Sequence, residues 1–116
     1  MTNVNPQMVY ALNHYLEHIK ADYAGWSKRG DPIRESMIKE FNDGITYEIH
    51  RKFAKVITSQ GGHHTSVHSF IMLEDDGKFK RGDILKAATW RAPAKNFARG
   101  NVLDLILDRV RWTGVI

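Results

Sequence analysis

Apolar residues near the start of the chain recur at intervals of three and four. This spacing predicts an α-helix that begins at Asn5-Pro6 and runs to about Ser27, with one apolar stripe. Asn caps free N–H groups at a helix start, and Pro tolerates the first helical position. The expected stripe consists of Val9, Leu12, Leu16, Ile19, Tyr23 and Trp26.

A second helix is predicted immediately afterwards. Gly30 ends the first helix, Asp31 caps the next one, Pro32 opens it and Gly44 ends it. Its apolar side is expected to carry Ile33, Met37 and Phe41. Residues 1–43 are therefore predicted to form a helical hairpin whose apolar stripes need a partner surface.

Downstream of Gly44 the hydrophobic period changes to two, which predicts strands. Alternating or β-favouring runs occupy residues 45–49, 53–58 and 66–73, and a hairpin turn is expected at residues 75–78. In the third run, one face is expected to carry Val67, Ser69, Ile71 and Leu73, and the other His68, Phe70 and Met72. Further strands are expected after the turn, at residues 84–88 and 110–113.

These elements predict an α+β fold, with two N-terminal helices packed on a curved antiparallel sheet of four to six strands. With 116 residues, the chain is expected to form a single domain. Within that domain, a β-rich part spans residues 44–116 and contains a basic loop at residues 90–101.

The basic loop fits neither hydrophobic period, and long irregular segments in small domains are often functional. Pro93 is expected to open a short helical turn that runs through Phe97. In such a turn Arg91, Lys95 and Arg99 would share one face, because they are spaced by four.

Charge is distributed unevenly around a formal net charge of +4. Residues 1–76 carry 8 basic and 10 acidic groups, whereas residues 77–116 carry 9 basic and 3 acidic groups. A basic C-terminal half favours a positively charged face that attracts phosphate or an acidic protein surface. The alternative is a basic surface that serves only solubility.

The chain has no cysteine, which excludes disulfides, thiolate metal sites and a cysteine nucleophile. No apolar run approaches the ~20 residues that span a bilayer, and no signal segment opens the sequence. We therefore expect no membrane partner.

Two sets of histidines are candidate metal ligands. His14 to His18 matches the H-x-x-E-H pattern of some zinc proteases, but both histidines fall opposite the apolar stripe and no third ligand is recognisable. A looser set lacks an identifiable carboxylate partner. That set consists of His50, His63, His64 and His68. We expect no metal site.

Enzymatic signatures are also missing. The sequence has no phosphate-cradling glycine loop and no G-x-S-x-G motif. Ser66 and His68, two apart on a predicted strand, point to the same face, but this spacing does not imply that they contact each other as nucleophile and base. We predict no catalytic residues, no cofactor and a protein that is not an enzyme.

The basic, amide and aromatic residues in and around the basic loop suit a phosphate-bearing ligand. Cations hold phosphate oxygens, side-chain amides read base edges, and an indole ring offers a stacking surface. His68 is included as a hydrogen-bond donor beside the loop. The predicted ligand-binding residues are His68, Lys86, Trp90, Arg91, Lys95, Asn96, Arg99 and Asn101. The alternative is that Trp90 and Phe97 anchor the core and the cations merely solvate the loop.

One stretch carries a family resemblance. Residues 82–94 read GDILKAATWRAPA, residues 98–101 read ARGN, and residues 66–70 read SVHSF. This pattern resembles a set of small uncharacterised bacteriophage proteins over roughly residues 45–116. The resemblance implies a virus-encoded accessory protein that acts in the cytoplasm of a bacterial host.

These observations predict a non-enzymatic module that binds a small nucleotide or a nucleic acid, in counter-defence or host takeover. The alternative is an inhibitor that docks on a host enzyme through leftover apolar or aromatic positions around Tyr10, Tyr15 or Phe79. Assembly into a homo-oligomer is left open by the sequence.

Overall fold

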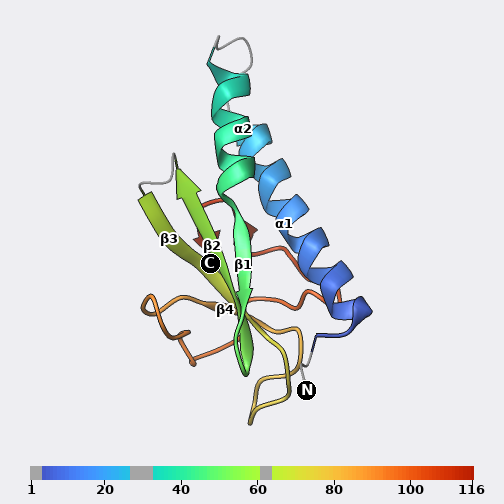
Figure 1. Cartoon of the computed structure of the whole chain (residues 1–116). Helices are drawn as coiled ribbons and strands as arrows, with labels where there is room; N and C mark the ends of the chain where they lie inside the picture. Colours follow the sequence, from blue (N-terminus) through green and yellow to red (C-terminus); the bar gives the residue numbers. More distant parts are fainter. Residues whose placement is uncertain (1–3, 27–32, 61–63) are drawn as a thin grey trace.

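A computed structural model describes residues 4–26, 33–60 and 64–116. Within these residues, two helices precede six strands. Figure 1 labels both helices and the first four strands. Their bounds are α1 (Pro6–Trp26), α2 (Arg34–Gly44), β1 (Thr46–Ile49), β2 (Phe53–Gln60), β3 (His64–Met72), β4 (Ile84–Lys86), β5 (Val110–Arg111) and β6 (Gly114–Val115).

The first four strands form one antiparallel sheet in the order β1-β2-β3-β4, and β5 pairs with β6 in a separate two-stranded sheet. The α+β class, the two N-terminal helices and the antiparallel sheet are therefore confirmed. The curvature of the sheet stays a prediction.

Helix α1 starts as the sequence predicted, because the Asn5 Oδ1 accepts the backbone N–H of Met8 at 2.9 Å. The phase of its buried stripe differs from the prediction. Val9 is exposed and Leu16 is half-buried. The residues of α1 that are buried instead are Met8, Ala11, Leu12, Tyr15, Ile19 and Tyr23.

Helix α2 ends at Gly44 as predicted. Most of the residues predicted to form its start are not described. Gly30, Asp31 and Pro32 lie outside the described residues. Ile33, expected on the apolar side, is exposed, whereas Phe41 is buried and its ring stacks on Tyr23 at 4.3 Å between ring centroids.

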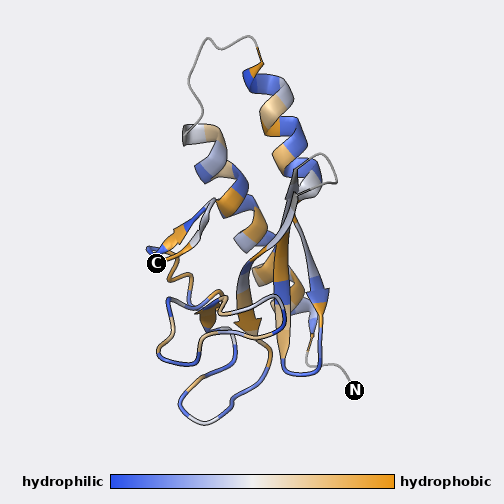
Figure 2. Cartoon of the chain, turned by 90° about the vertical axis from the view of Figure 1, so that its left-hand side faces the viewer, coloured by the Kyte–Doolittle hydropathy of each residue, from blue (hydrophilic) through white to orange (hydrophobic). Residues whose placement is uncertain are grey.

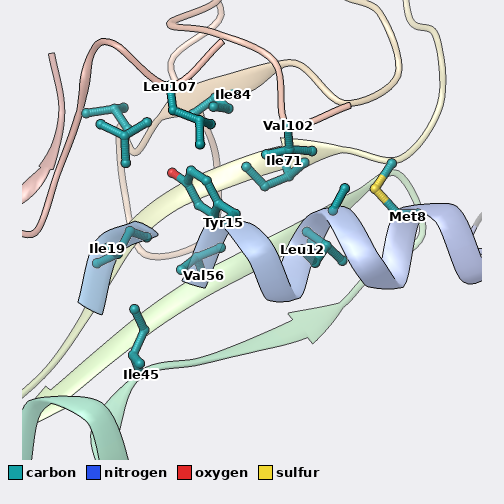
Figure 3. Close-up of a cluster of buried hydrophobic side chains, with 14 of the residues drawn as sticks. Met8, Leu12, Tyr15, Ile19, Ile45, Val56, Ile71, Ile84, Val102 and Leu107 are labelled. Atoms are coloured by element: carbon teal, nitrogen blue, oxygen red, sulfur yellow. The ribbon is translucent and has the colours of Figure 1, made fainter. Parts of the chain in front are cut away.

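The main core lies between α1 and one face of the sheet. In Figure 3, Leu12 and Tyr15 of α1 lie close to Val56 of β2 and Ile71 of β3. Ile84 of β4 and residues of the C-terminal segments belong to the same buried cluster. The helical hairpin therefore finds its partner surface in the sheet, as its apolar stripes required.

A β-bulge in β3 corrects the predicted faces of that strand. Val56 pairs with Ser69 and Ile57 pairs with Val67, so His68 is an extra residue on β3. Because alternation shifts by one residue at a bulge, Val67 packs on the opposite side of the sheet from Ile71, where the sequence placed both together.

The second face of the sheet carries a smaller apolar cluster. Phe70 and Met72 of β3 pack there with Leu85 of β4 and with Phe79, and Ala98 packs against them. Phe79 comes from the loop after β3 and Ala98 from the segment after β4, so both contribute to this face. In Figure 1 the loop after β4 lies on the side of the sheet away from α1. Figure 2, which faces that side, shows many hydrophilic positions along the loops after β3 and β4.

The segment after β4 is extended rather than helical, which corrects the predicted turn from Pro93 to Phe97. The N–H of Ala94 donates to the Lys86 carbonyl and the N–H of Arg99 donates to the Ile84 carbonyl, both at 2.7 Å. Pairing with β4 therefore outweighs local helix formation. The prediction that Arg91, Lys95 and Arg99 share a helix face is wrong.

Among residues 4–26, 33–60 and 64–116, neither helix combines the length and the apolar character needed to cross a bilayer.

Candidate functional site

Trp90 lies at the tip of a tight turn and forms the first of two aromatic clusters. The N–H groups of Ala88 and Thr89 donate to the Ala92 carbonyl at 3.1 Å, and Thr89 Oγ1 accepts the N–H groups of Arg91 and Ala92. Trp90 is 47% exposed. These bonds fix the backbone of the turn, and Trp90 is half-exposed at its tip, so the alternative in which Trp90 anchors the core is wrong.

The ammonium group of Lys55 lies 4.3 Å from the centroid of the Trp90 ring. Lys55 comes from the middle of β2 and is buried. A cation removed from water interacts more strongly with an aromatic face than an exposed one does. We call Lys55 and Trp90 the Trp90 cluster.

Phe97 forms the centre of a second cluster. Its ring centroid lies 3.9 Å from the guanidinium carbon of Arg99 and 5.8 Å from that of Arg109. Phe97 is also 47% exposed. Planar guanidinium groups stack on aromatic faces. Here Arg99 lies two residues after Phe97, whereas Arg109 comes from the chain just before β5.

Asn96 links this second ring to another loop. Its Oδ1 accepts the N–H of Phe97 at 2.8 Å and lies 3.5 Å from Arg99 Nη2, and the Nζ of Lys78 donates to its backbone carbonyl. We call Lys78, Asn96, Phe97, Arg99 and Arg109 the Phe97 cluster.

Arg99 has an unusual environment for a charged side chain. It is only 7% exposed, and its Nε and Nη1 are buried without a hydrogen-bond partner. Among the described residues, none of the ion pairs involves Arg99. A buried positive charge without a carboxylate is costly, which makes this position attractive for an anion.

Arg91 and Lys95 lie on the segment that joins the two clusters. Both are exposed, and residues 86–101 contain no acidic residue. The predicted residues between 90 and 99 thus lie on one segment that carries a half-exposed aromatic ring near each end. They are Trp90, Arg91, Lys95, Asn96 and Arg99.

Asn101 is occupied within the fold. Its Nδ2 donates to the Arg81 carbonyl and to Asp83 Oδ1, and its Oδ1 accepts the N–H groups of Leu103 and Asp104. This arrangement stabilises the turn after residue 101, so we leave Asn101 out of the candidate surface.

Lys86 is exposed but separate from the Trp90 cluster. Along β4, Ile84 belongs to the core beneath α1 and Leu85 to the cluster on the opposite face. By the alternation of side chains along a strand, Lys86 shares the face of Ile84, whereas Lys55 contacts Trp90 on the other side.

His68 lies beneath α1 rather than beside the basic loop, which corrects its predicted position. Its Nδ1 is 2.8 Å from Ser69 Oγ, and its Nε2 is 2.6 Å from the Arg111 carbonyl oxygen. Tyr15 Oη lies 2.6 Å from the same Ser69 Oγ. The bulge at His68 directs its ring into this network.

The network has one consistent direction of donation. Because the Arg111 carbonyl only accepts, Nε2 of His68 carries the proton, and Nδ1 accepts from Ser69, which in turn accepts from Tyr15. Burial lowers the pKa of His68 to about 4, opposed by the bond to Arg111 and by the charge of Asp22. Burial raises the pKa of Tyr15, and the bond to Ser69 partly opposes this.

Replacing Tyr15 with phenylalanine is expected to lower the free energy of unfolding by about 1 kcal/mol, since Ser69 loses its donor. Chemical denaturation at pH 7 measures this difference. Tyr10→Phe is the matched control, because the Tyr10 side chain is exposed on the same helix and its change should have no effect. An unchanged stability in Tyr15→Phe would show that this hydroxyl contributes nothing.

The candidate metal-ligating histidines are only partly within the described residues. His14 is exposed and its ring stacks on Tyr10, and His63 and the side chain of His64 lie outside the described residues. Within the part of the chain that the structure describes, no three His, Asp or Glu side chains gather to hold a metal ion.

Two of the positions suggested for protein docking are buried. Tyr15 is fully inaccessible in the core, and Phe79 belongs to the cluster on the opposite face of the sheet. The expectation that they remain available for a partner is wrong. Tyr10 is exposed.

A cavity of about 570 Å³ lies between the end of α1 and the turn that joins β5 to β6. Asp22 and Arg111 contribute to its lining, and Asp22 Oδ2 accepts the N–H of Trp112 at 2.8 Å. None of the predicted ligand-binding residues lines it. Of the predicted residues, Trp90, Asn96 and Arg99 belong to the two aromatic clusters instead.

Sequence reasoning missed three of the basic residues in these clusters. Lys78 and Arg109 lie outside the basic loop in sequence, and no local pattern connects them with it. Lys55 carried a weak signal, because a lysine interrupts a run of β-favouring residues from Phe53 to Thr58.

A family model extends over nearly the whole of this fold, with residues 3–116 matching the family of unknown function DUF7717. The chain belongs to this family. The DUF7717 match includes both helices as well as both aromatic clusters, whereas the phage-like pattern begins near residue 45. The bacteriophage origin stays a prediction. Comparisons with curated proteins and with solved structures gave no match.

Proposed function

We propose that this protein binds a phosphate-bearing ligand, a nucleotide or a nucleic acid, through the Trp90 and Phe97 clusters and the segment between them. The supporting observation is the convergence of cations from separate segments on two half-exposed rings. Lys55 reaches Trp90 from β2, and Arg109 reaches Phe97 from the C-terminal region. Cations beside exposed aromatic rings suit phosphate oxygens and the bases attached to them.

Binding without catalysis is part of this proposal. The phage-like pattern of residues 45–116 adds an accessory role in the cytoplasm of a bacterial host, in counter-defence or host takeover. In that setting the ligand is a nucleotide signal or a viral or host nucleic acid.

Charge reversal on the joining segment tests the proposal. Lys95→Glu and Arg91→Glu are each expected to weaken binding of a fluorescent dT12 oligonucleotide, and of ATP, by about tenfold or more at low salt. The slope of log affinity against log salt for dT12 should fall in magnitude by about one for each variant. Fluorescence anisotropy and competition with ATP measure both quantities.

Lys39→Glu is the matched control. It makes the same charge change at an exposed lysine of α2, where Lys39 pairs with Asp43 at 2.7 Å. We expect this variant to bind as the wild type does. Equal losses in Lys39→Glu and Lys95→Glu would mean that only overall charge matters, and absence of binding to both ligands would overturn the proposal.

A further inference from the structure

We infer that the phosphate-bearing ligand is single-stranded nucleic acid, and that Trp90 and Phe97 are two separate stacking points for its bases. This inference rests on the proposed function and names the ligand class for the same surface.

The Trp90 ring is prepared for stacking before a ligand arrives. Buried Lys55 contacts the ring while Trp90 as a residue remains 47% exposed. The backbone of the turn is fixed by the bonds from Ala88 and Thr89 to Ala92. A ring held in place loses little conformational freedom when a base stacks on it.

The Phe97 ring is held independently of the Trp90 ring. Arg99 and Arg109 lie over it, and Asn96 fixes its backbone N–H. Because each ring has its own cations from different segments, the two rings form two stacking points rather than one pocket.

The segment between the rings supplies charge along the path of a strand. Arg91 and Lys95 are exposed there, and the bond from the Ala94 N–H to the Lys86 carbonyl fixes the segment against β4. Trp90 and Phe97 are seven residues apart, so their Cα atoms are separated by at most about 25 Å. A mononucleotide offers one base, whereas a strand offers successive bases and phosphates to both rings.

Single strands fit this arrangement better than duplexes do. In a duplex the bases are stacked on each other and their faces are not available to protein rings, whereas a single strand can place its bases on aromatic side chains. We therefore expect binding that depends on strand length and tolerates changes of base.

The test compares dTMP, ATP, dT4, dT8, dT12 and a 12-base-pair duplex at one salt concentration. We expect affinity to increase from dTMP to dT12 and to be higher for dT12 than for the duplex. Trp90→Leu and Phe97→Leu should each weaken dT12 binding by about five- to a hundredfold while leaving the salt slope unchanged. Tyr10→Leu, which removes an exposed aromatic residue from α1, should have no effect.

The outcomes separate this inference from the proposed function. If ATP or the duplex binds as tightly as dT12, the inference fails and the proposed function stands. If wild-type affinity is retained in both leucine variants, the stacking points are wrong although binding remains. If neither dT12 nor ATP binds, the proposed function itself fails.

Discussion

Replacing Arg99 with methionine is expected to raise the melting temperature of the free protein and to weaken its binding of dT12. The two effects have one cause. Arg99 is nearly buried, with Nε and Nη1 unpartnered, and each unsatisfied buried group costs about 1–3 kcal/mol. Methionine has a similar length and no charge, so it removes this cost and also removes the cation over Phe97.

The contact with Phe97 opposes part of the gain, because a cation over an aromatic ring contributes about 0.5–2 kcal/mol. We expect a net increase in the free energy of unfolding of about 1 kcal/mol, which corresponds to roughly 4 °C for a chain of this size. Thermal unfolding without ligand measures the first effect, and anisotropy with dT12 measures the second. A surface built for binding often lowers the stability of the free protein in this way.

Arg109→Met is the control for Arg99→Met, since it removes the other guanidinium near Phe97. Arg109 is exposed and its Nη1 donates to the carbonyl of Ile116 at 3.1 Å. Its replacement should leave the melting temperature nearly unchanged. A lower melting temperature in Arg99→Met would identify Arg99 as a purely structural residue and contradict the assignment of its charge to ligand binding.

The ends of several elements were predictable because local chemistry determines them. Asn5 caps α1 through its own side chain, and Gly44 ends α2 where the hydrophobic period changes. Gly77 adopts a φ of 61° in the turn before Phe79, a conformation that glycine enters without strain. Each of these signals involves residues within a few positions of one another.

The phase of the α1 stripe was not predictable from spacing alone. Two stripes at helical spacing share Leu12, Ile19 and Tyr23, and the structure buries the one that also contains Tyr15. The hydrogen bond from Tyr15 to Ser69, a partner 54 residues away, helps to select this stripe. The bulge in β3 is likewise set by pairing with β2, so the reversal of faces at His68 has no local sequence signal.

The candidate site shows the same division between local and distant contacts. Trp90, Arg91, Lys95 and Asn96 could be predicted because they follow one another in an irregular basic segment. The extended path of that segment depends on its pairing with β4, which competes with a helical turn and prevails. The cations that complete the two clusters come from distant segments, and only the tertiary fold brings them to the rings.

Acidification from pH 6.5 to pH 4 is expected to remove about 3 kcal/mol of stability through His68 alone. Burial lowers the pKa of His68 from 6.5 to about 4 in the folded protein. Above pH 6.5 the ring is neutral in both the folded and the unfolded chain, so the full stability is present. Between pH 6.5 and 4 only the unfolded chain takes up the proton, and the folded state therefore loses stability as pH falls.

Protonation also conflicts with the hydrogen bonds around the ring. A protonated Nδ1 must donate to Ser69 Oγ, which then can no longer donate to His68 and must turn its own proton toward Tyr15. The Tyr15 hydroxyl would lose its acceptor in the core, where it is fully buried. Geometry and burial thus both favour the neutral ring.

Urea denaturation of wild type and His68→Gln across pH 4–8 isolates this contribution, since carboxylates titrate in both proteins and cancel in the difference. The free-energy advantage of the wild type should shrink by about 3 kcal/mol between pH 7 and pH 4. If His68→Gln does not fold, the Cε1 chemical shift of His68 in the wild type gives the same information, because it should keep its neutral value at pH 5. A ring that is already protonated at pH 5, or a difference in stability that stays constant with pH, would contradict a buried neutral His68.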